Sequence, residues 1–118
     1  MPAMDDLRIT AEVVIPAGEL HWRFDPSGGP GGQHANKSST RVELSLDVTT
    51  STAFDDVLRK RILDQLEARL KDGVLTIQVG ESRSQWRNRQ ISRQRMAAAL
   101  REAMRPPQPK RRRTKPGR

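Results

Sequence analysis

A glycine-rich segment, 27–38, separates two segments in which apolar and polar residues alternate. The apolar positions are Leu20, Trp22 and Phe24 before it, and Val42, Leu44, Leu46 and Val48 after it. An alternation of period two is typical of a strand that buries one face. The sequence therefore predicts two strands joined by a connection from Asp25 to Thr40. Hairpin loops usually need only about 2–5 residues, so a connection this long is either functional or a floppy surface insertion.

Two helices and a third strand are predicted after this hairpin. The first helix begins at Thr52-Ala53-Phe54-Asp55, which resembles a capping box, and its apolar residues recur at helical spacing as far as Leu70. We expect Asp72-Gly73 to end this helix, with Gly73 as a left-handed cap. A strand follows at Leu75–Val79, and a second helix runs from about Ser84 to Met104. A short edge strand is also expected at Ile9–Ile15.

These elements predict an α+β fold, namely a small mixed sheet in the order β-β-α-β-α with both helices packed on one face. A strand–helix–strand unit favours a parallel, right-handed crossover, so we expect the strands on either side of the first helix to be parallel. The predicted organisation is a flexible N-terminus at 1–8, one domain at 9–104 that carries the glycine-rich loop at 26–40, and a disordered tail at 105–118.

Composition excludes several classes of function. The chain has no cysteine and only two histidines, so we expect no disulfide, no thiol nucleophile and no metal site. No apolar run approaches the roughly 20 residues that a membrane-spanning helix requires. The first ten residues lack the apolar central region of a signal peptide. A soluble cytoplasmic protein is therefore expected.

The net charge of +8 is concentrated in the tail. The tail has seven basic residues and no acidic ones, namely Arg105, Lys110, Arg111, Arg112, Arg113, Lys115 and Arg118. Four prolines in the same segment oppose helix formation. This pattern indicates an arm that becomes ordered on a polyanion, and nucleic acid is favoured over a membrane surface or a purely solubilising tail.

The loop contains no strong nucleophile. The stretch from Gly31 to Ser38 approaches a phosphate-binding loop, but Asn36 replaces the required glycine and a strand follows instead of a helix. Gly31 and Gly32 leave the backbone bare, and the Gln33 amide can position a water and donate to developing negative charge. That chemistry suits an activated substrate such as an ester. His34 could act as a general base, although a hydrogen-bonding or stacking role is favoured.

Three motifs resemble one family. Gly-Pro-Gly-Gly-Gln-His-Ala-Asn-Lys-Ser-Ser-Thr at 29–40 is similar to the GGQ loop of class I peptide-release factors, and its Gly-Gly-Gln-His-x-Asn-Lys core is closest to the single-domain, codon-independent ribosome-rescue hydrolases of the alternative rescue factor B type. Ile15-Pro16-Ala17-Gly18-Glu19-Leu20 and Arg83-Ser84-Gln85-x-x-Asn88-Arg89 resemble the same group. Pro30 departs from the alanine that is common in bacterial members.

The resemblance implies a peptidyl-tRNA hydrolase that acts on stalled ribosomes without a cofactor. Gly31, Gly32 and Gln33 would be catalytic, with Gln33 placing the water and its backbone N–H stabilising the transition state. Contacts to ribosomal RNA or tRNA would come from His34, Asn36, Lys37, Arg83, Ser84, Gln85 and Arg89. The basic tail would lie in the empty mRNA channel. The implied partners are the ribosome and peptidyl-tRNA, with no membrane, and the chain would act as a monomer.

Two other functions stay open. The chain could be a ribosome-binding or RNA-binding module that occupies the site without cleaving, or a release factor that needs a separate codon reader. Among the remaining residues, we expect Trp22, Phe24 and Trp86 to lie in the core rather than to stack on bases. Arg87, Arg93 and Arg95 form either a solvated helix face or contacts to RNA phosphates.

Overall fold

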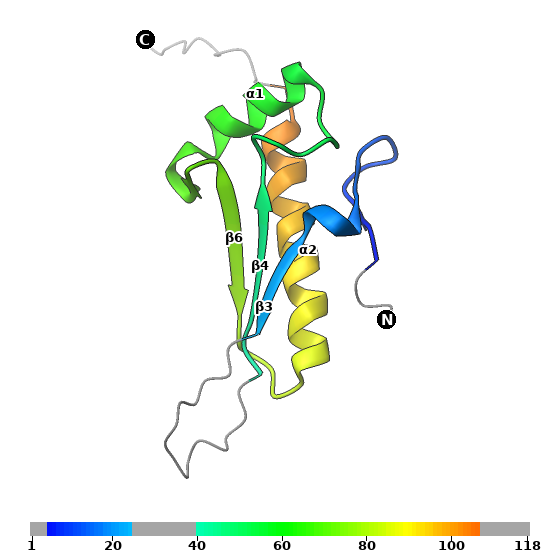
Figure 1. The fold of residues 1–118 in the computed structure, drawn as a ribbon, viewed down its shortest axis with the longest axis vertical. Coiled ribbons are helices and arrows are strands. Elements are labelled where there is room, and N and C mark those ends of the chain that lie inside the picture. Colours follow the sequence, from blue (N-terminus) through cyan, green and yellow to red (C-terminus); the bar gives the residue numbers. More distant parts are fainter. Residues whose placement is uncertain (1–4, 25–39, 107–118) are drawn as a thin grey trace, which may run out of the picture.

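The computed structural model describes residues 5–24 and 40–106. Its centre is a four-stranded sheet in the order β3-β4-β6-β5. These strands are β3 (His21–Phe24), β4 (Val42–Asp47), β5 (Leu70–Lys71) and β6 (Val74–Val79). The long helix α2 (Gln85–Met104) runs along one face of the sheet, and α1 (Asp56–Gln65) crosses one end of it (Figure 1). The predicted α+β class, with two helices and a small sheet, is confirmed.

Alternation along β4 and β6 builds the core. Val42, Leu44 and Leu46 of β4 are buried, as are the alternate β6 residues Leu75, Ile77 and Val79. All of these except Val42 belong to one core cluster with residues of both helices, including Ile62 of α1 and Met96 and Leu100 of α2. The intervening residues point to the other face, where Ser45 lies opposite Thr76 and Glu43 opposite Gln78. The face away from the helices is therefore polar.

The predicted parallel pairing is wrong, because β4 and β6 are antiparallel, with Leu44 opposite Ile77. The chain does not cross back along the sheet after β4. It remains at the end where Asp47 lies, forms α1 there, and enters β6 from that same end (Figure 1). The hydrogen bond from the Val48 N–H to the Gly73 carbonyl, at 2.9 Å, joins the segments at this end.

The first helix also differs from its predicted bounds. Its N-cap is Asp55, whose carboxylate accepts a 2.8 Å hydrogen bond from the Leu58 N–H. The helix ends at Gln65, and the 3-10 helix η4 (Glu67–Arg69) leads into β5. Asp72 and Gly73 do not cap a helix. Their φ angles of 55° and 81° are those of the tight turn that joins β5 to β6.

The N-terminal segment forms two strands where one was predicted. β1 (Leu7–Arg8) and β2 (Val14–Ile15) pair antiparallel, and the Ile9 N–H donates to the Val13 carbonyl at 2.8 Å in the turn between them. The predicted strand at Ile9–Ile15 is thus mostly turn. Ile9, Val13 and Ile15 are nevertheless buried in the common core.

The second helix matches its prediction. Ser84 is the N-cap of α2 and accepts a hydrogen bond from the Arg87 N–H at 3.0 Å. Within residues 5–24 and 40–106, no helix is long and apolar enough to cross a membrane.

Candidate functional site

The six loop residues that were predicted to act in catalysis or RNA binding lie outside the described residues. They are Gly31, Gly32, Gln33, His34, Asn36 and Lys37. The same holds for the basic tail beyond Pro106. What the structure describes is the base of the loop, where Phe24 ends β3 and Thr40 precedes β4. Phe24 and Val42 are the last paired residues of this hairpin.

Asn88 ties the C-terminal side of this base to α2. Its side chain is fully buried in the first turns of the helix. Its Nδ2 donates to the Thr40 carbonyl at 2.8 Å and to the Ser82 carbonyl at 3.0 Å, and its Oδ1 accepts from the Ser82 N–H at 3.0 Å. The Thr40 hydroxyl also donates to the Ser82 carbonyl, at 2.7 Å. The point where the chain leaves the loop is therefore held by a closed network.

Arg89 contacts the N-terminal side of the base. Its guanidinium carbon lies 5.1 Å from the centre of the Phe24 ring, and the Phe24 and Trp22 rings are stacked with centroids 6.2 Å apart. Its Nη2 donates to Gln85 Oε1 at 3.3 Å. The Arg89 Nε is buried and has no hydrogen-bond partner among the described residues. One helix turn thus contacts both strands that lead into the loop.

The four residues at the start of α2 that were predicted to bind RNA fall into two groups. Ser84 caps the helix, Gln85 binds Arg89, and Arg89 packs on Phe24, so these three side chains make contacts within the chain. Arg83 is exposed. Sequence reasoning gave no role to Asn88, although it lies in the motif. A signal was present, because asparagine is a poor residue for a helix interior and needs a specific hydrogen bond to stay there.

The remaining arginines have distinct surroundings. Four of them donate to backbone carbonyls and fix the fold, namely Arg59, Arg61, Arg93 and Arg101. Others form ion pairs, such as Arg95 with Glu81, whose nitrogen and oxygen are 2.8 Å apart. Arg41, Arg83 and Arg87 make no side-chain hydrogen bond or ion pair within the described part of the chain. All three are exposed and belong to the end that carries the loop.

A sequence model of the RF-1 domain family matches residues 8–118. The chain belongs to the RF-1 domain family. It is also similar to the protein named peptidyl-tRNA hydrolase ArfB of Pseudomonas putida, with 33% identity over 111 residues. That alignment covers 93% of this chain and 80% of the relative. The family expected from the three motifs is therefore confirmed.

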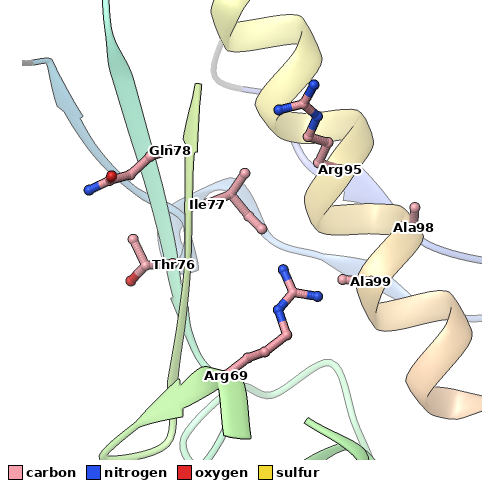
Figure 2. Close-up of a pocket in the computed structure, with 7 residues that line it drawn as sticks. All are labelled: Arg69, Thr76, Ile77, Gln78, Arg95, Ala98 and Ala99. Carbon is pink, nitrogen blue, oxygen red and sulfur yellow. The ribbon is translucent and has the colours of Figure 1, made fainter. Parts of the chain in front are cut away.

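A groove of about 480 Å³ lies elsewhere on this RF-1 domain, between β6 and α2 (Figure 2). Its lining consists of Arg69, Thr76, Ile77, Gln78, Arg95, Ala98 and Ala99. None of the predicted site residues is among them. Among the described residues, no three His, Cys, Asp or Glu side chains gather closely enough to hold a metal ion.

Two carboxylates of the RF-1 domain have shifted pKa values. Burial raises the pKa of Glu19, but hydrogen bonds from the Ser51 and Thr52 hydroxyls and the Thr52 N–H outweigh it, so the net pKa is lowered. The Thr49 hydroxyl likewise holds the pKa of Asp47 below its usual value. Asp47 ends β4 at the opposite end from the loop, so these shifts concern stability rather than the site.

Proposed function

We propose that this protein hydrolyses the ester bond of peptidyl-tRNA on stalled ribosomes. The observation that carries the proposal is the 33% identity, over 93% of the chain, to a protein named peptidyl-tRNA hydrolase. The RF-1 domain match spans the segment with Gly31, Gly32 and Gln33, which supports their assignment as the catalytic residues.

In the proposed reaction a water molecule supplies the nucleophile. Its oxygen attacks the carbonyl carbon of the ester, the bond from that carbon to the ribose oxygen breaks, and the water proton ends on the ribose oxygen. The Gln33 side chain positions the water and the backbone N–H of Gln33 donates to the developing oxyanion. Gly31 and Gly32 allow the close approach of the backbone to the substrate. In this proposal, ribosomal RNA supplies the rest of the active site.

Contacts at the base of the loop support the proposed positioning of the water by Gln33. A loop that places one water must keep its two strands at a fixed separation, because small misplacements of a positioning group cost large factors in rate. Asn88 holds the strand that leaves the loop, through Thr40, and Arg89 packs on the strand that enters it, at Phe24. We assign both as positioning residues.

The finer points of the proposal concern the ribosome. Rescue would be independent of the codon, with the basic residues from Lys110 to Arg118 in the empty mRNA channel and the chain acting as a cytoplasmic monomer. His34, Asn36, Lys37 and Arg83 would contact RNA.

The test is peptide release from ribosomes stalled on truncated mRNA. Gln33→Ala and Gly32→Ala should slow release by roughly 10²–10³-fold, in the range for loss of an oxyanion donor. Gln94→Ala, at an exposed position of α2, serves as the control and should release normally. Normal release by both loop variants would refute the catalytic assignment. Ribosome binding without release by the unmodified chain would favour a non-catalytic module, and release only at a stop codon would favour a partner of a codon reader.

A further inference from the structure

Trp86 does not lie in the core, as its apolar character predicts, but has 61% of its surface exposed. It is in the first turn of α2, two positions before the buried Asn88. Residues two apart in an α-helix point about 200° away from each other. The indole therefore projects from the side of the helix opposite to the core. An indole that is mostly in water gains only a small part of the free energy that its burial would give.

The charges around Trp86 are unbalanced. Arg83 lies three residues before it and Arg87 directly after it, and both are exposed. Neither arginine side chain has a hydrogen bond or ion pair within residues 5–24 and 40–106. The nearest acidic residue in sequence, Glu81, is engaged by Arg95 at 2.8 Å. Two arginines that lie close to Trp86 in the sequence therefore have no acidic partner among the residues that the structure describes.

This combination fits RNA better than an acidic protein. An unpaired nucleobase offers a planar face of matching size, and the phosphates on either side of it offer bidentate acceptors for guanidinium groups. An acidic peptide would satisfy the arginines and leave the indole in water. We propose that Trp86 stacks on an unpaired nucleobase of ribosomal RNA or tRNA while Arg83 and Arg87 bind neighbouring phosphates. The inference rests on the proposed function, since it takes the ribosome as the partner.

The position of this contact gives it a consequence for the loop. Trp86 is in the same helix turn as Gln85, Asn88 and Arg89, which contact each other or the two strands at the base of the loop. A nucleobase held on Trp86 would fix this turn relative to the RNA. The distance between the stacked nucleobase and the loop would then be set by the rigid start of α2 rather than by the loop itself.

The first experiment measures the affinity of the full chain for ribosomes stalled on truncated mRNA. Trp86→Ala should bind roughly tenfold more weakly, in the range for loss of one stacked base, whereas Trp86→Phe should retain most of the affinity. Val57→Ala is the matched control, because Val57 is 62% exposed on α1 and should leave binding unchanged. Unaltered affinity of Trp86→Ala, or equal losses for the alanine and phenylalanine variants, would overturn the stacking assignment.

Salt dependence separates stacking from charge. Affinity falls as salt rises, and Arg87→Gln should reduce the steepness of the plot of log affinity against log salt by about one, since one phosphate contact is lost. Trp86→Ala should weaken binding and leave that slope unchanged. A slope that falls with Trp86→Ala and not with Arg87→Gln would contradict the assigned roles.

The second experiment places a photoreactive phenylalanine analogue at position 86 and maps its cross-link on the same ribosomes. Cross-linking to a nucleotide is expected, and its identity tells ribosomal RNA from tRNA. Cross-linking to a ribosomal protein would overturn the inference in favour of a protein partner. Neither experiment reads peptide release. A chain that cross-links to RNA but releases no peptide therefore refutes the proposed activity alone, and a releasing chain that cross-links to protein refutes this inference alone.

Discussion

Replacing Asn88 with alanine removes one side chain and three hydrogen bonds from the base of the loop. Each such bond contributes about 1 kcal/mol net, so the three together contribute about 3 kcal/mol. Thr40 and Ser82 are only half-buried, and water can replace part of what their backbone groups lose. We therefore expect the free energy of unfolding to fall by about 2 kcal/mol. A domain with a stability of roughly 5–15 kcal/mol stays folded after that loss.

Asn88→Asp is the sharper variant. The aspartate keeps the size of the side chain and the oxygen that accepts from the Ser82 N–H. Its second oxygen, however, faces the carbonyls of Thr40 and Ser82 where the amide donated. Two acceptors in contact repel each other, so the aspartate should destabilise at least as much as alanine at neutral pH. Protonation of the carboxyl restores a donor, and part of the loss should disappear in acid.

The assays are urea unfolding followed by circular dichroism and single-turnover peptide release on stalled ribosomes. Release by Asn88→Ala should slow while ribosome affinity changes little, because the network lies inside the protein. Gln94→Ala, on an exposed position of the same helix, controls for substitution in α2. An unfolding free energy equal to that of the unmodified chain would refute the energetic reasoning. A clear loss of stability with an unchanged release rate would refute the positioning role.

Three further predictions concern other parts of the chain. Glu19 and Asp47 have lowered pKa values, so the unfolded chain binds protons more readily than the folded one, and stability should decline as the pH falls below the ordinary values of 4.5 and 3.8. Glu19→Gln should lower the unfolding midpoint at pH 7 and make this decline in acid less steep. An acid profile identical to that of the unmodified chain would contradict the assignment. Gly73→Ala should destabilise by about 1–2 kcal/mol from its positive φ, with more from a clash of the new Cβ with the Thr49 methyl. In urea unfolding, Thr49→Ser in the same chain, which removes the methyl and keeps the hydroxyl, should recover only the clash, whereas an unchanged midpoint for Gly73→Ala would count against strain at this turn. Deletion of 105–118 should weaken ribosome binding and flatten its salt dependence, because its seven cations are lost, and an equal salt slope would show that the tail does not contact phosphate.

The elements with a clear period could be predicted from the sequence. Alternation identified β4 and β6, and the apolar residues of α2 together with its cap at Ser84 gave both ends of that helix. The direction of β6 could not be predicted, because it depends on where α1 lies relative to the sheet. Asp72-Gly73 was assigned to a helix end, although the same dipeptide is typical of a hairpin turn, because a left-handed glycine serves both.

The site was only partly accessible to sequence reasoning. The motif that contains Ser84, Gln85 and Arg89 was found, but most of its side chains bind within the chain rather than pointing to a partner. A sequence motif identifies residues with a role but does not show whether their side chains bind within the chain or point to a partner. Trp86 illustrates the converse, because apolar character predicted burial while its position on the helix, opposite the buried face, leaves it in water.

The short length of β5 leaves two-thirds of β6 as an open sheet edge. β5 pairs only with Val74 and Leu75, so within the described residues β6 from Thr76 to Val79 pairs on one side alone. Such an edge is a template for strand addition by a second copy, and charged side chains are the usual defence. Arg69 and Arg95 flank this edge, in the groove beside β6 (Figure 2). Two copies that met edge to edge would bring their Arg69 guanidinium groups close together, and the repulsion between these charges would oppose such pairing.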